Sequence, residues 1–124
     1  MKVSTRLTTL LGIEVPIIQA PIGSATTPEL VVAVSNAGAM GMLALSWCDL
    51  SETRQCIIKT NELTQNPFGI NLVLAWPQHE RLDIALEEGV SFISTFWGDP
   101  RPYVDYVHSA GAMHIHTVGS WQEA

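Results

Sequence analysis

Two amide side chains interrupt runs that are otherwise apolar, and they are the first candidates for chemistry. Asn71 lies within the run 68–73, and Gln19 lies within the run 17–20. A buried amide costs free energy unless it finds a hydrogen-bond partner. Asn71 therefore either bonds neighbouring backbone or faces a polar ligand, and the sequence leaves both open. For Gln19, a bond to the next strand explains the residue at least as well as a ligand contact does.

The run that holds Gln19 is followed by Ala20-Pro21-Ile22-Gly23, a loop with little side-chain bulk. Such a loop lets a flat ligand approach the backbone closely. Small residues are common in loops, so this feature becomes informative only in combination with others.

His114 and His116 are two residues apart in a predicted strand, so they face the same way. A His-x-His pair can hold a metal ion, but only with further ligands from other strand ends. The acidic residues that could supply them, Asp49 and Asp99, are predicted as helix caps. We therefore predict no metal site and expect both histidines to line a hydrated barrel interior.

Three large aromatic residues, Trp47, Trp76 and Trp97, each come shortly after a predicted strand. Parallel strands end at one edge of a sheet, so these side chains share a rim. They either form the wall of an apolar substrate pocket or pack against the helices, and the sequence does not decide between the two.

Strands and helices are predicted to alternate strictly along the chain. After a short helix at 5–11, strands are predicted at 17–20, 40–45, 68–73, 90–96 and 113–118, and helices at 28–37, 49–63, 78–88 and 101–109. No hairpin signal joins any two strands, so the connections predict a parallel sheet. Ser120 and Glu123 match a capping box, which predicts the start of a further helix.

Eight such strand–helix units make a (β/α)8 barrel, and five cannot close one. The chain is then either the amino-terminal portion of a longer barrel or a five-stranded doubly wound domain, and the capping box favours the first. We expect an α/β fold of parallel βα units that form the first part of a TIM barrel. Residues 1–124 would be the amino-terminal part of a single barrel domain, truncated after the fifth strand.

Composition excludes several classes of protein. The 124 residues are 47% hydrophobic and 15% charged, which is typical of a globular domain. A net charge of −6 argues against nucleic acid or an anionic membrane as a partner. No apolar run reaches the roughly 18 residues needed to span a bilayer, and no secretory signal is visible. We expect a cytoplasmic protein with two reduced cysteines, without nucleic-acid or membrane partners.

Several segments together resemble the nitronate monooxygenase family, also called 2-nitropropane dioxygenases. The resemblance rests on Pro16-Ile17-Ile18-Gln19-Ala20-Pro21, Thr27-Pro28-Glu29-Leu30, Ala33-Val34-Ser35-Asn36-Ala37-Gly38, Asn66-Pro67-Phe68-Gly69-Ile70-Asn71-Leu72, Glu87-Glu88-Gly89-Val90 and Ser109-Ala110-Gly111-Ala112. It runs from about residue 5 to residue 124, and it also covers the related FMN-dependent enoyl-acyl-carrier-protein (enoyl-ACP) reductases.

The resemblance implies a (β/α)8 barrel that binds FMN at the carboxyl ends of its strands. It implies that the backbone of Ala20, Pro21 and Ile22 lies against the isoalloxazine ring and that Asn71 contacts the flavin. The family's catalytic histidine and its glycine-rich phosphate loops match nothing in these 124 residues, so no catalytic residue is assigned to this chain. In particular, neither His114 nor His116 takes that role.

The implied function is FMN-dependent oxidation of alkyl nitronates by O2, with a nitronate or nitroalkane as the small-molecule substrate. The alternatives are an FMN-dependent enoyl-ACP reductase and a non-catalytic half-barrel assembly module. We expect the 124-residue chain alone to be inactive and to self-associate, because its edge strands and inner face would lack partners.

Overall fold

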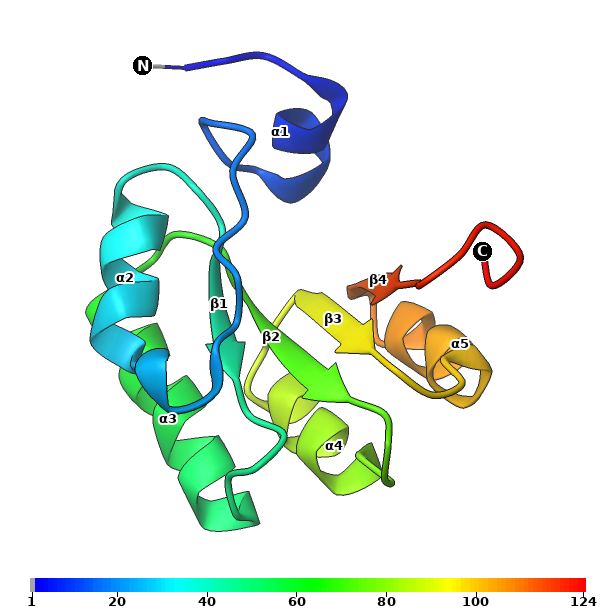
Figure 1. The fold of residues 1–124 in the computed structure, drawn as a ribbon. Helices are drawn as coiled ribbons and strands as arrows, with labels where there is room; N and C mark the ends of the chain where they lie inside the picture. The colour runs from blue at the N-terminus through cyan, green and yellow to red at the C-terminus, as the bar shows by residue number, and fades with distance from the viewer. Residues whose placement is uncertain (1) are drawn as a thin grey trace.

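The computed structural model describes residues 2–124 and has a four-stranded parallel sheet with a helix after each of the first three strands (Figure 1). The strands are β1 (Gly41–Ala44), β2 (Phe68–Val73), β3 (Phe92–Phe96) and β4 (Met113–Thr117). Each pairs in parallel with the next, and their order in the sheet is β1-β2-β3-β4. Strand order follows chain order without the reversal of a doubly wound sheet, which confirms the predicted order for these strands.

The first predicted strand, residues 17–20, is not a strand in the structure. It makes one isolated parallel bridge, between Ile18 and Met40, just before β1. Gln19 N donates to Met40 O at 2.9 Å, and Met40 N donates to Ile17 O at 3.0 Å. The segment therefore runs beside β1 in the expected direction but does not extend the sheet as a strand.

Two features explain why this pairing stops after one bridge. Pro16 and Pro21 flank the segment and have no N–H to donate to a ladder. The side chain of Gln19 then takes the place of the next backbone pair. Its Nε2 donates to Met42 O at 3.3 Å, and Met42 N donates to its Oε1 at 3.4 Å.

Most helices form close to their predicted bounds, and their capping residues explain where they begin. Thr27 accepts from Leu30 N ahead of α2, and Asp49 forms a capping box with Glu52 ahead of α3. The helices are α1 (Arg6–Leu11), the 3₁₀ turn η1 (Gly23–Ala25), α2 (Pro28–Asn36), α3 (Leu50–Leu63), α4 (His79–Glu87) and α5 (Arg101–Ser109).

The helix predicted from Ser120 and Glu123 does not form, and these residues make a turn instead. Glu123 N donates to Ser120 O at 3.3 Å. The Glu123 carboxylate accepts from Gly119 N at 2.8 Å, one residue before the position that a capping box requires. This contact closes a turn and does not satisfy the N–H groups of a first helical turn.

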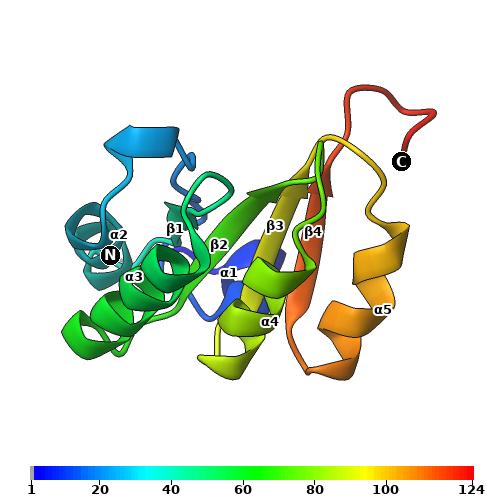
Figure 2. The ribbon, with the colours of Figure 1, turned by 90° about the horizontal axis from the view of Figure 1, so that it is seen from below.

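The sheet has two faces of different character (Figures 1 and 2). Helices α2 to α5 cover one face, and α1 lies on the other. Ile70 and Leu72 are completely buried in the core cluster that the sheet shares with α2 to α5. On the opposite face, Leu11 of α1 packs in a smaller cluster with Met42 and Phe92. We call these the helix face and the inner face of the sheet.

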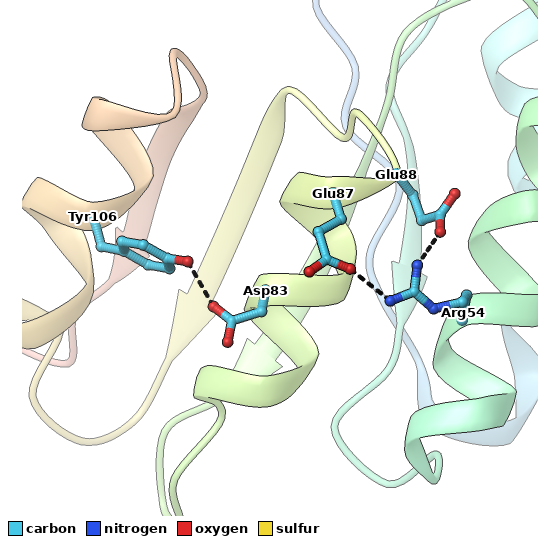
Figure 3. Close-up of polar contacts among 5 residues, drawn as sticks. All are labelled: Arg54, Asp83, Glu87, Glu88 and Tyr106. Carbon is cyan, nitrogen blue, oxygen red and sulfur yellow. Dashed lines mark hydrogen bonds and ion pairs between the residues drawn. The ribbon is translucent and has the colours of Figure 1, made fainter.

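The helices on the helix face are also joined by polar contacts (Figure 3). Arg54 of α3 forms ion pairs with Glu87, at 2.6 Å, and with Glu88 at the end of α4. The hydroxyl of Tyr106 in α5 donates to Asp83 of α4 at 2.7 Å. Within residues 2–124, no helix is long and apolar enough to cross a membrane.

Candidate functional site

A cavity of about 740 Å³ lies at the carboxyl ends of β1, β2 and β3. This edge is where parallel α/β folds place ligands, and the volume is in the range of small-molecule sites. Its walls come from the loop before η1, from the ends of the three strands and from the turns after β1 and β3. Among the lining residues are Pro21, Ile22, Asn71, Trp47, Phe96 and Trp97.

The cavity brings together three of the four residues predicted to bind a cofactor. Pro21, Ile22 and Asn71 all line it, although the loop and β2 are some fifty residues apart in the sequence. Ala20 is exposed and is not among the lining residues. Its carbonyl oxygen accepts from Gln19 Nε2 at 3.3 Å, so this residue precedes the cavity wall and its backbone is already engaged.

Asn71 lies on the inner face of β2, and its neighbours Ile70 and Leu72 face the helices. Its Nδ2 donates to the Oγ of Ser94 at 3.1 Å, and the two residues are register partners in β2 and β3. Among residues 2–124, no donor reaches its Oδ1 within hydrogen-bond distance. The amide is thus held at one end by the sheet, and its oxygen has no hydrogen-bond partner among the described residues.

Ser94 is the residue of this site that the sequence reasoning missed. It alternates with Phe92 and Phe96 along β3, which places all three on the inner face. That alternation was readable from the sequence, but the pairing with Asn71 depends on the register between β2 and β3.

Of the two roles predicted for Gln19, the structure shows the bond to the next strand and not the ligand contact. Both ends of its amide bond the backbone of Met42, so the side chain is used to align the first segment with β1. It is not among the residues that line the cavity.

The tryptophans divide between the two roles that the sequence left open. Trp47 and Trp97 line the cavity, whereas Trp76 packs edge-on against Trp47 with ring centroids 5.5 Å apart. Phe96 and Trp97 stack with ring centroids 5.4 Å apart. Two of the three therefore form an aromatic rim, and the third supports it from outside.

The turn after β3 holds Trp97 in an unusual backbone conformation. Its φ is +60°, and the next residue, Gly98, has φ +69°. A Cβ at Gly98 would lie 2.4 Å from the carbonyl oxygen of Leu74, so only glycine fits there. Close packing of this turn on the end of β2 thus fixes the position of the Trp97 ring at the rim.

The two histidines of β4 do not face the barrel interior, and that prediction is wrong. They are register partners of Ile93 and Thr95, and Ile93 belongs to the helix-face core. The Oγ1 of buried Thr95 lies 2.7 Å from His114 Nε2 and 2.8 Å from His116 Nδ1. Met113, one residue earlier, packs on the inner cluster near α1, which turns both histidines to the other side.

Burial and the neighbouring His116 and His108 lower the pKa of His114 below its ordinary value. A hydroxyl has a single proton, so at most one of these two imidazole nitrogens accepts from Thr95 and at least one donates to it. Within residues 2–124, no three His, Cys, Asp or Glu side chains gather closely enough to hold a metal ion.

The cavity is aromatic and weakly polar, and its described lining contains no Lys, Arg or His. Cys48 lines it, and burial raises the pKa of its thiol, which keeps it protonated near neutral pH. The Glu52 carboxylate also lines it, but this group accepts from Asp49 N at 3.0 Å in the cap of α3. The described part of the site therefore offers ring-stacking surface, an amide acceptor and one carboxylate that serves a helix cap.

Comparison with known proteins places the chain in a family. The family model described as nitronate monooxygenase matches residues 4–80. The chain is 46% identical to the nitronate monooxygenase of Pseudomonas aeruginosa over 67 aligned residues. These residues make up 54% of the chain and 19% of that protein. It is 33% identical to the (3aS,4S,5R,7aS)-5-hydroxy-7a-methyl-1-oxo-octahydro-1H-indene-4-carboxyl-CoA dehydrogenase of Mycobacterium tuberculosis, over 100% of the chain and 35% of that protein.

Among solved structures, FabK from Thermotoga maritima superposes with a TM-score of 0.91 and 32% identity, over 96% of this chain and 39% of that one. The chain thus spans little more than a third of these two relatives. The likeness confirms the predicted fold class, parallel βα units that form the first part of a (β/α)8 barrel. On the match of the family model and on this agreement in fold, the chain belongs to the nitronate monooxygenase family.

Proposed function

We propose that the protein carrying this chain oxidises alkyl nitronates with O2 and FMN, and that Pro21, Ile22 and Asn71 form the ring-side wall of the flavin site. The observation that carries this proposal is the convergence of Pro21, Ile22 and Asn71 on one cavity at the strand ends. Family membership supports the same reaction class.

The chemistry of the cavity fits a flavin ring. FMN would supply the electron acceptor, which O2 then reoxidises. The backbone of Pro21 and Ile22 would lie against the ring, with Ala20 leading into this wall, and Asn71 would bond a polar atom on the ring edge. Trp47 and Trp97 would cover the site and exclude water, which favours a small substrate with an apolar substituent.

The cavity does not fit the phosphate of FMN. A phosphate site commonly uses a glycine-rich loop that leads into a helix start, with free N–H groups and a positive dipole. Helix α3 begins at this cavity, but Asp49 already caps its first turn, which also has the acidic Glu52. Helix α2, which follows η1, begins with Thr27 capping Leu30 N and with Pro28 in its first turn. We therefore propose that this chain is the amino-terminal part of one barrel domain and that the phosphate is held by other parts of the protein.

The titratable groups of the described cavity bear on the substrate, because its carboxylate, Glu52, serves the cap of α3. A neutral nitroalkane must lose a carbon-bound proton, and a placed general base contributes about 10²–10⁴-fold to such a step. A preformed nitronate needs no such step. We propose the anionic nitronate as the substrate that these residues can serve, with any base for nitroalkanes supplied from elsewhere.

An FMN-dependent enoyl-ACP reductase is the second candidate, because the T. maritima FabK superposes so closely. The two functions differ in the electron donor. A reductase consumes NAD(P)H and an enoyl thioester, whereas a nitronate monooxygenase consumes O2 and nitronate without added nicotinamide. A non-catalytic assembly module would do neither.

The test follows O2 consumption and flavin fluorescence in the full-length protein. We expect nitronate-dependent O2 uptake, and Asn71→Ala should weaken FMN binding by about 1–3 kcal/mol, the cost of one lost buried hydrogen-bond partner. Asn61→Ala, an exposed amide on α3, is the matched control. Consumption of NAD(P)H with an enoyl thioester, without nitronate oxidation, would favour the second candidate.

The 124-residue chain by itself should neither turn over nitronates nor remain a monomer. Phe96 and Ile115 on the inner face are 41% and 45% exposed, and among the described strands β4 pairs on one edge only. Sedimentation velocity should therefore detect dimers or larger species at micromolar concentration. A compact monomer with nitronate oxidase activity would contradict both expectations.

A further inference from the structure

The hydrogen bond between Asn71 and Ser94 occupies one end of the Asn71 amide and leaves the other end for a ligand. A side-chain amide has a donor end, the NH₂ group, and an acceptor end, the carbonyl oxygen. In this structure the donor end is engaged, because Nδ2 donates to Ser94 Oγ at 3.1 Å. The acceptor, Oδ1, is left for whatever occupies the cavity that Asn71 lines.

The backbone on both sides of this bond is fixed. Asn71 lies in β2 between β1 and β3, and Ser94 lies in β3 between β2 and β4. Each residue is thus inside the sheet with ladders on both edges, and the two are direct register partners. Ser94 is not among the residues that line the cavity, so its hydroxyl acts on the ligand only through Asn71.

We propose that Ser94 is a positioning residue that holds the Asn71 amide with its oxygen toward the ligand, so that the site selects a ring bearing an N–H. This inference rests on the proposed function and makes it more specific. An oxidised isoalloxazine ring has a single N–H, at N3 between its two carbonyl groups. Asn71 Oδ1 is then the acceptor for the N3–H, and a ligand with a carbonyl at that point would meet another acceptor and be disfavoured.

The experiment compares two ring probes, lumiflavin and 3-methyl-lumiflavin, in which a methyl group replaces the N3 hydrogen. Neither has a phosphate, so each can be titrated against the full-length protein freed of FMN, with flavin fluorescence as the readout. We expect lumiflavin to bind about tenfold or more tightly than its N3-methyl analogue, the ratio expected when one buried hydrogen bond is replaced by an unpaired acceptor.

Variants at Ser94 test the positioning role. In Ser94→Ala the amide loses its anchor and can rotate to present NH₂, so the affinity ratio should fall toward one. Ser94→Thr keeps a hydroxyl in a β-branched side chain that suits a strand, and it should restore the ratio. Ser91→Ala, an exposed serine just before β3, is the matched control and should keep the wild-type ratio.

Each outcome has a distinct meaning. Equal affinity of the wild-type protein for the two probes overturns this inference and leaves the proposed flavin site intact. An unchanged ratio in Ser94→Ala overturns the role of Ser94. Failure of the wild-type protein to bind lumiflavin at all overturns the ring-side assignment and this inference together. Should the alanine variant fail to fold, Ser94→Cys replaces it, because cysteine is near serine in volume but is a weak acceptor. The affinity ratio of the two probes should fall in this variant too.

Discussion

Alternate residues of the same strands form the two faces of the sheet, yet the side chains on these faces have different surroundings. On the helix face, Ile70, Leu72 and Ile93 are completely buried and pack against α2 to α5. On the inner face, Asn71 is half-buried at the wall of an open cavity. The period of two in a strand therefore places a core residue and a cavity-lining residue at neighbouring positions.

The inner face itself changes along the strands. At the amino ends, Met42 and Phe92 are buried under α1. In the middle, Asn71 and Ser94 form a polar pair, and at the carboxyl ends the cavity opens under an aromatic rim. The helix face shows no such gradient among its core residues. The cavity, and with it the proposed flavin site, lies on the part of the inner face that α1 does not cover.

The largest effect should come from removing a helix-face side chain. Ile70→Ala deletes a completely buried side chain from the main core. It should lower the free energy of unfolding by about 2–5 kcal/mol, measured by urea denaturation. Asn71→Ala, one residue along and on the inner face, should cost clearly less. Equal losses of unfolding free energy in Ile70→Ala and Asn71→Ala would contradict the distinction between a core face and a cavity face.

Gly69→Ala tests the packed, amino-terminal part of the inner face. A Cβ at Gly69 would lie 2.5 Å from Cδ1 of Phe92 and 2.8 Å from its carbonyl oxygen, with Met42 Sδ at 2.7 Å. The backbone oxygen cannot move aside easily, so we expect a loss of about 1–3 kcal/mol from overpacking. Gly23→Ala is the control, because its Cβ would meet nothing within 4 Å. A neutral Gly69→Ala variant would mean that this part of the inner face is loosely packed.

A smaller, pH-dependent effect is expected from the histidines on the helix face. The pKa of His114 is lowered in the folded chain by burial, so folding favours the neutral imidazole. Its contribution to stability is present above its ordinary value of 6.5 and is lost as the pH falls through the lowered pKa. The free energy of unfolding of His114→Gln, measured at several pH values, should fall less steeply below that value than in the wild type. Identical pH profiles would contradict this.

The smallest effect is expected from the polar contacts between helices. Arg54→Gln removes the ion pairs with Glu87 and Glu88 (Figure 3). Exposed pairs contribute little and are screened by salt, with a Debye length of about 3 Å at 1 M. The change in unfolding free energy should be near the precision of a denaturation experiment and should vanish in 1 M salt. A loss comparable to that of Ile70→Ala would show that these contacts are part of the core.

Much of the fold could be predicted from local signals. The apolar run of β2, the cap at Thr27 and the capping box at Asp49 each depend on residues close in sequence, and the structure contains them as expected. Strand alternation alone places Asn71 and Ile70, which are neighbours in β2, on different faces of the sheet. The resemblance to a family added the choice of Asn71 and the loop at 20–22 as flavin contacts, which remain proposals.

The remaining features depended on contacts between distant residues. The sequence determined that residues 17–20 are apolar and extended, but their pairing stops because the Gln19 amide bonds the backbone of Met42. It determined that His114 and His116 share a face, but only packing of Met113 near α1 and the hydroxyl of Thr95 decided which face. Local periodicity fixes which residues lie together on a strand. The side on which they lie, and the partner that meets them, are set by strand register and by what packs on each face, and these are properties of the tertiary structure.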